Sequence, residues 1–121
     1  MILVDTSVWV DHLHRGDSLV AELLEQGVVA MHSLVLGELA CANLKKRQET
    51  LSILAALPGA SVATHSEALD LIEMRKLMGR GLGFVDVHLL ASALISGDVI
   101  WSRDRALAAA ADDLKVCFHT S

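Results

Sequence analysis

The chain has 121 residues, of which 53% are hydrophobic and 3% aromatic, and its formal net charge at pH 7 is −5. This composition excludes a disordered chain and predicts one domain over residues 1–121 with an aliphatic core. The acidic balance weakens the case for nucleic-acid binding by charge alone but does not exclude a nuclease, since bound metal ions would offset site carboxylates. We expect no transmembrane helix because no run of about 18 apolar residues is free of charge.

The first 31 residues predict strand, helix, helix and strand. The continuous apolar run 2–5 is typical of a buried strand and ends in Asp5. Thr6 or Ser7 is expected to cap the next helix, which Gly16 ends. A second helix over 18–26 and a strand over 28–31 follow.

The middle of the chain is predicted to be mainly helical. Ser33 is expected to cap a helix to Arg47, continued by helix over 49–57. A turn at Pro58 leads to a weaker strand over 61–64, and Ser66 is expected to cap a helix to Met78. A glycine-rich loop over 79–83 comes next.

The C-terminal third predicts a helix over 84–96, a strand over 99–102, a helix over 105–112 and a fifth strand over 116–118. Strands that alternate with helices indicate an α/β fold in three layers, with a central parallel five-stranded sheet flanked by helices.

Four acidic residues are expected at one edge of this sheet. Asp5 and Asp104 follow buried strands, and Glu38 and Asp86 come from helix starts that should open at the same edge. Four converging carboxylates repel one another unless a cation holds them, and oxygen ligands favour a hard ion such as Mg²⁺ or Mn²⁺. Such an ion activates water for hydrolysis of a phosphodiester.

Taken singly, three of these acids have structural explanations. Asp104 could cap its helix, Asp86 could be favoured by the helix dipole, and Glu38 could be a solvated helix residue. Asp5 is harder to explain, because a buried unpaired charge is costly.

Histidine and cysteine, the usual zinc ligands, do not cluster along the chain, and we expect no histidine to bind metal. Cys41 and Cys117 form no CxxC pair, which favours small core residues in a reducing cytoplasm.

The acids lie in four segments that resemble a known family: residues 2–9 around Asp5, residues 33–39 with Glu38, residues 83–86 followed by 89–91 with Asp86, and residues 101–104 ending in Asp104. In order and spacing these segments resemble PIN-domain ribonucleases, and among them the VapC-type toxins of toxin–antitoxin pairs.

The resemblance implies a homodimer that cleaves RNA with Mg²⁺ or Mn²⁺. It also implies a VapB-like antitoxin that inserts a segment near the site, with higher-order complexes between the two. It makes Asp5, Glu38 and Asp86 metal ligands, while Asp104 completes the pocket. The hydroxyl before the last acid, often Thr in the family, is Ser102 here.

Other polar residues near these motifs are candidates for supporting roles. Thr6, Ser7 and Ser102 are candidates for holding the acids, and Arg80 and Arg103 for contacting the RNA backbone. His88 is open between a residue of the helix face and a substrate contact.

Two other functions remain possible from the sequence. The first is a phosphohydrolase or phosphotransferase with Asp5 as nucleophile, although position 7 is Ser where common aspartyl-phosphatase motifs have a second Asp. The second is a catalytically silent module that binds RNA or protein, which the acidic charge and the shortage of aromatic residues disfavour for RNA.

Overall fold

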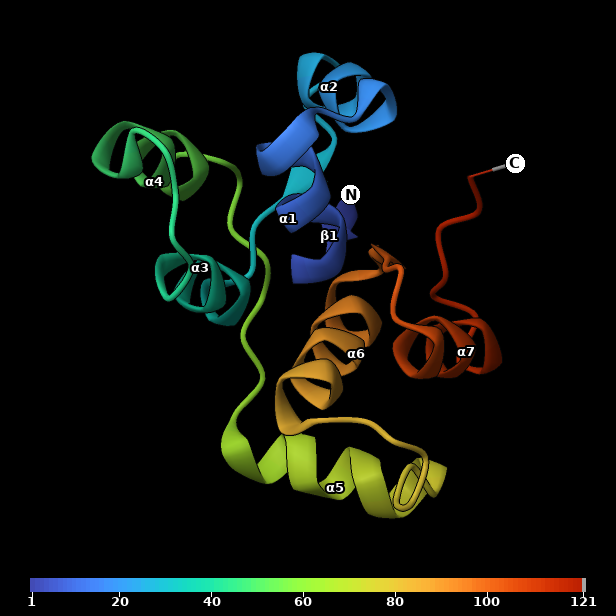
Figure 1. Ribbon diagram of the computed structural model, residues 1–121. Coiled ribbons are helices and arrows are strands. Elements are labelled where there is room, and N and C mark those ends of the chain that lie inside the picture. Colours follow the sequence, from blue (N-terminus) through green and yellow to red (C-terminus); the bar gives the residue numbers. More distant parts are fainter. Residues whose placement is uncertain (121) are drawn as a thin grey trace.

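A computed structural model describes residues 1–120 (Figure 1). The elements, in chain order, are β1 (Ile2–Val4), α1 (Thr6–Arg15), α2 (Ser18–Glu25), β2 (Val29–Ala30), α3 (Ser33–Ala40), α4 (Arg47–Ala55), α5 (His65–Arg75), α6 (Phe84–Ser96), β3 (Val99–Trp101) and α7 (Arg105–Asp113).

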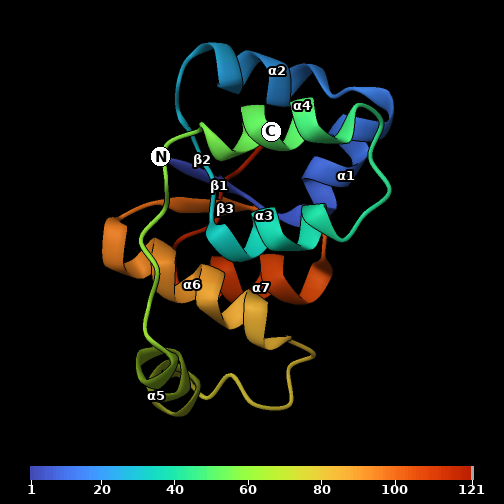
Figure 2. The ribbon, with the colours of Figure 1, turned by 90° about the vertical axis from the view of Figure 1, so that its left-hand side faces the viewer.

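The sheet is parallel and short, with strand order β2-β1-β3. Leu3 of the central strand pairs with Ala30 on one side and Ile100 on the other. Figure 2 shows α1, α2 and α4 on one side of the sheet and α6 and α7 on the other, with α5 outermost against α6. The α/β class and the parallel sheet are therefore confirmed.

The prediction of five strands is wrong for the part of the chain that the structure describes. The expected strand over 61–64 is absent, and the chain beside β2 makes a single bridge between Met31 and Gly59. The expected fifth strand is reduced to a bridge between Ile100 and Cys117. Both outer segments lie beside strands of only two or three residues, which offer few backbone groups for a longer ladder.

Several helix boundaries also differ from the prediction. The helix expected over 33–47 ends at Ala40, and Lys46, with φ of 48°, precedes a separate α4. Three expected caps lie at neighbouring residues instead: Asp5 occupies the N-cap of α1, His32 that of α3 and Thr64 that of α5.

His32 caps α3 through its ring, because Nδ1 accepts a hydrogen bond from the Leu34 N–H at 3.0 Å. Burial lowers the pKa of His32, and the nearby His88 lowers it further, so the imidazole is neutral and able to accept.

The core is aliphatic, as expected, with two aromatic exceptions at its centre. Trp9 is fully buried and Trp101 is nearly so, alongside Leu3, Leu90 and Leu107. Within residues 1–120 no helix combines the length and apolar character needed to cross a membrane. The core fixes β1 between its neighbours, and this positions the residue that follows β1.

Candidate metal centre

Asp5 lies at the centre of the site because it directly follows the central strand. Its backbone N–H donates to the carbonyl of Trp101 at 2.9 Å, which fixes the end of β1 against β3. The residue is only 6% exposed. A buried carboxylate in such a place needs strong hydrogen bonds or a bound cation.

Two serine hydroxyls hold Asp5 from opposite ends of the chain. Ser7 and Ser102 each donate to its Oδ2 at 2.8 Å. Each hydroxyl is itself oriented by a backbone N–H, that of Arg103 onto Ser7 and that of Asp104 onto Ser102, both at 3.0 Å. Both hydroxyl protons are therefore directed at Asp5, and its Oδ1 has no hydrogen bond within residues 1–120.

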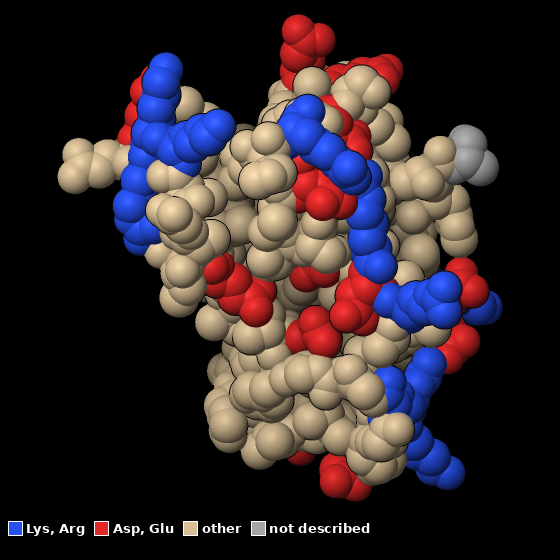
Figure 3. Space-filling view, in the orientation of Figure 1, with Lys and Arg blue, Asp and Glu red and all other residues tan. Residues whose placement is uncertain are grey.

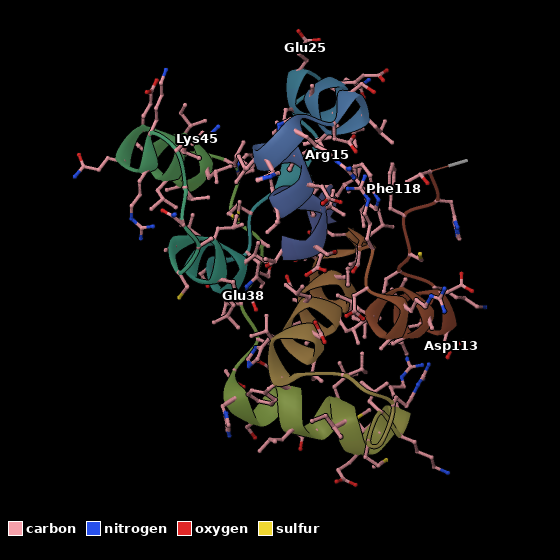
Figure 4. The ribbon with its side chains drawn as sticks, viewed as in Figure 1. Arg15, Glu25, Glu38, Lys45, Asp113 and Phe118 are labelled. Atoms are coloured by element: carbon pink, nitrogen blue, oxygen red, sulfur yellow. The ribbon has the colours of Figure 1, made fainter. Side chains whose placement is uncertain are left out.

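Glu38 reaches the site from the second half of α3, and not from a helix start as expected. The helix dipole therefore does not stabilise its charge. Thr6 takes that role, since its hydroxyl donates to Glu38 Oε1 at 2.6 Å. Figure 4 shows Glu38 on the side of α3 that faces α6.

Asp86 and Asp104 belong to helix starts, as expected. Asp86 Oδ2 accepts from the Gly83 N–H at 2.8 Å, at the beginning of α6. Asp104 is the N-cap of α7, where Oδ1 accepts from the Leu107 N–H at 3.0 Å. The structural explanations offered for these two acids are therefore true, and they do not exclude a functional one.

The four acids share one pattern: one oxygen is anchored by a protein donor, and the other has no hydrogen bond within the described chain. None of the four makes a salt bridge within residues 1–120 either. Figure 3 shows acidic side chains around a hollow at the centre of this face, with Lys and Arg side chains at its margins.

The acids affect one another electrostatically. Burial raises the pKa of Asp86, and the hydrogen bond from Gly83 partly opposes this effect. The negative charges of Asp5, Asp104 and Glu38 raise the pKa of Asp86 further. The structure thus brings the four predicted acids into one electrostatic cluster, in which full ionisation is unfavourable without a cation.

The donor set fits a hard divalent cation. All the available atoms are carboxylate oxygens, and no cationic side chain competes for them in the described residues. No three of these acids bring ligand atoms within 4.8 Å of one another. That spacing suits Mg²⁺, which keeps several of its waters and takes one or two carboxylates directly.

The two arginines named from the sequence do not point at the acids. Arg80 pairs with Asp113 at 2.7 Å. Arg103 pairs with Asp11 and Asp17, both at 2.6 Å. Sequence analysis missed these pairs because the partners are 33 to 92 residues apart.

His88 is an interior residue of α6 and not part of the exposed helix face. It is 8% exposed, and its ring packs edge-on against Phe84 with centroids 4.7 Å apart. Its Nδ1 has no hydrogen-bond partner within residues 1–120.

Fold and site together define an α/β protein whose parallel sheet presents a cluster of four carboxylates at one edge. The PIN domain family model matches residues 2–113. Ribonuclease VapC32 of two Mycobacterium tuberculosis strains is 49% identical over 111 residues, which cover 91% of this chain and 90% of the relative.

The chain therefore belongs to the PIN domain family. A solved structure of VapC20 from M. tuberculosis, described as a toxin that cleaves the sarcin–ricin loop, has a similar fold. It matches with a TM-score of 0.63 and 22% identity over 91% of this chain and 95% of that one.

Proposed function

We propose that residues 1–121 form one PIN-like nuclease domain that hydrolyses RNA phosphodiester bonds with Mg²⁺ or Mn²⁺, as the toxin of a toxin–antitoxin pair. The observation that carries the proposal is the set of four carboxylates that, within residues 1–120, each keep one oxygen without a hydrogen bond and lack a cationic partner. The names of the relatives, Ribonuclease VapC32 and the VapC20 toxin, support the ribonuclease activity and the toxin role.

One or two of Asp5, Glu38, Asp86 and Asp104 would bind the ion directly and the others would bind it through its waters, in each case by the oxygen that makes no hydrogen bond within residues 1–120. The ion supplies an activated water and relieves negative charge on the phosphate. The hydroxyls of Ser7 and Ser102 fix the orientation of Asp5, and that of Thr6 fixes Glu38. These hydrogen bonds hold the acids in place against their mutual repulsion.

The negative charges of the four carboxylates would repel an RNA phosphate. The cation must therefore be bound before the RNA can bind at the site. The test is cleavage of RNA by the purified protein with Mg²⁺ or Mn²⁺ and loss of cleavage on chelation. Metal-independent cleavage would contradict the proposal. Trapping of a beryllofluoride adduct on Asp5 would instead support the phosphotransferase alternative.

A VapB-like antitoxin is the proposed partner in the cytoplasm, and a groove beside α1 is available to receive one of its segments. The groove has a volume of about 370 Å³ and lies between α1 and the chain that joins α3 to α4, with Val10, Leu13, Leu44 and Lys45 among its lining residues. The gene product of a small neighbouring open reading frame should relieve toxicity on expression. Unrelieved toxicity would contradict the pairing.

We also propose a homodimer, supported by the exposed apolar side chains on α5 and α6. Met74 is 76% exposed and Ile95 is 55% exposed. Met74→Glu or Ile95→Glu should convert a dimer to a monomer in light scattering. Ile53→Glu, on α4 and also exposed, is the matched control that should remain dimeric.

A further inference from the structure

A second cluster of potential metal ligands lies on α7 and the segment that follows it. The ligand atoms of Asp112, Cys117 and His119 all lie within 4.8 Å of one another. His119 Nε2 is 3.8 Å from Asp112 Oδ1. Among residues 1–120 this is the one such group of three, and it contradicts the expectation that histidine and cysteine do not cluster.

The turn after α7 brings these residues together. Lys115, with φ of 61°, reverses the chain, and the Val116 N–H donates to the Ala111 carbonyl at 2.8 Å. The chain then runs extended past β3, where the Ile100 N–H donates to Val116 and the Phe118 N–H donates to Ile100. Figure 1 shows this extended segment leaving α7 towards the C-terminus.

Alternation along this segment decides which side chains face α7. Val116 is buried, and Phe118 packs against Trp101 with ring centroids 5.6 Å apart. Cys117 and His119 therefore share the opposite side of the extended chain. Asp112, in the last turn of α7, lies beside Cys117 and His119 on this side.

We propose that Asp112, Cys117 and His119 form a second metal site, for Zn²⁺ or a similar borderline-soft ion, distinct from the acidic centre. Thiolate, imidazole and carboxylate are the ligand types that Zn²⁺ takes. Three protein ligands leave a fourth tetrahedral position for water. Bonds of about 2.0–2.3 Å place ligand atoms roughly 3.3–3.8 Å apart, so closure needs shifts on the order of 1 Å.

The surroundings permit that closure. The side chains of Asp112 and His119 are 66% and 73% exposed, and His119 Nε2 lies 3.8 Å from Asp112 Oδ1, so both side chains are able to turn towards one ion. Burial raises the pKa of the Cys117 thiol, and the charge of Asp112 raises it further, so the metal-free thiol keeps its proton at neutral pH. Binding replaces that proton with the metal, and the two negative charges of thiolate and carboxylate then balance a divalent cation.

The consequence is a metal clamp between α7 and the C-terminal segment. Because Asp104 is the N-cap of α7, the clamp lies at the far end of a helix whose start belongs to the acidic centre. The clamp does not depend on the proposed nuclease function, since its ligands and its metal preference differ from those of the four carboxylates.

The test is a titration of the full chain with Co²⁺ under a non-thiol reductant, followed by absorbance. One equivalent should produce a thiolate-to-cobalt charge-transfer band, and Zn²⁺ should remove it while excess Mg²⁺ does not. Cys117→Ser should abolish the band, whereas Cys41→Ser, at the other cysteine, should keep it. Asp112→Asn and His119→Ala should each weaken binding by about 10-fold or more.

A second readout is proton release, measured calorimetrically for Zn²⁺ in buffers of different ionisation enthalpy. About one proton should leave per ion in the wild type and none in Cys117→Ser. Circular dichroism establishes that each variant is folded. Absence of the band, its persistence in Cys117→Ser, or its removal by Mg²⁺ would overturn the proposal.

Discussion

Two groups of acidic side chains lie near Arg103 and Asp104, and they differ in whether an arginine pairs with them. Asp11 and Asp17 share the guanidinium of Arg103, with both contacts at 2.6 Å. Asp104, the next residue after Arg103, belongs to a cluster that has no salt bridge within residues 1–120. The difference shows that Arg103 pairs with acids outside the cluster, which leaves the cluster free to bind an external cation.

One aspartate of each group, Asp17 and Asp86, shows the difference in its pKa. The pKa of Asp17 is lowered, first by the Val20 N–H and then by Arg103, so its stabilisation is present above its unfolded pKa and is lost as pH falls through the folded one. The pKa of Asp86 is raised, chiefly by burial, so its contribution is fully present below the unfolded pKa and is lost as pH rises through the folded one. At neutral pH Asp17 therefore stabilises the fold, whereas Asp86 destabilises the metal-free protein.

The largest effect is expected at the centre of the open cluster. Asp5→Asn keeps the side-chain shape but removes the charge, and RNA cleavage should fall by more than about 100-fold, since loss of even an outer partner of a metal ligand costs about 10–100-fold. Initial rates on a labelled RNA measure this. Asp113→Asn, which removes an exposed acid paired with Arg80, is the control and should cleave at the parent rate.

Metal binding should reverse the cost of the open cluster. Mn²⁺ at about 100 times its Kd should stabilise the fold by about 2.7 kcal/mol, which raises Tm by roughly 10 °C in a chain of this size. Asp86→Asn should lose most of that rise, whereas Asp17→Asn should keep it. Because the pKa of Asp86 is raised, the rise should also shrink as pH falls towards that pKa. An equal Mn²⁺ response in Asp86→Asn would place the ion elsewhere.

The parts of this comparison that the sequence predicts are those set by local patterns. Asp5 directly follows one apolar run and Asp104 lies three residues after another, which ends at Trp101. Helix α6 runs from Phe84 to Ser96 as expected because Gly97, with φ of 70°, ends it. Glu38 is a predicted site residue, but its position late in α3 is not predicted, because α3 ends at Ala40 and not at Arg47 as expected.

The parts that the sequence did not predict depend on pairs far apart in the chain. The anchoring of Asp5 by Ser102 spans 97 residues, and that of Glu38 by Thr6 spans 32. The cluster at Cys117 is not predicted for a related reason. The C-x-H spacing is visible in the sequence, but the turn that brings Asp112 to Cys117 depends on a positive φ at Lys115, which a non-glycine residue rarely adopts.

A smaller effect is expected from the hydroxyls that orient Asp5. Ser7→Ala or Ser102→Ala removes one hydrogen bond to Oδ2 of Asp5 and should lower cleavage or Mn²⁺ affinity by about 10-fold. This is the lower end of the roughly 10–100-fold loss expected when a residue that hydrogen-bonds a metal ligand is removed. Ser102→Thr retains the hydroxyl and should restore most of the activity. If both alanine variants matched the parent, Asp5 would not depend on these hydrogen bonds for its orientation.

The smallest effect tests the comparison most directly, because one substitution is made in each group. Asp86→Asn keeps an oxygen for the Gly83 N–H and removes repulsion on the order of 1 kcal/mol, so Tm of the metal-free protein should rise by about 2–4 °C at neutral pH. Asp17→Asn caps α2 as well as Asp does but loses the ion pair with Arg103, and Tm should fall by about 2–4 °C. The gap between the two variants should narrow at acidic pH, first as Asp86 is protonated, because its pKa is raised, and at still lower pH as Asp17 is protonated, because its pKa is lowered. Thermal melts in chelator at neutral and acidic pH measure it, and an unchanged or lowered Tm of Asp86→Asn at neutral pH would mean that the open cluster carries no electrostatic cost.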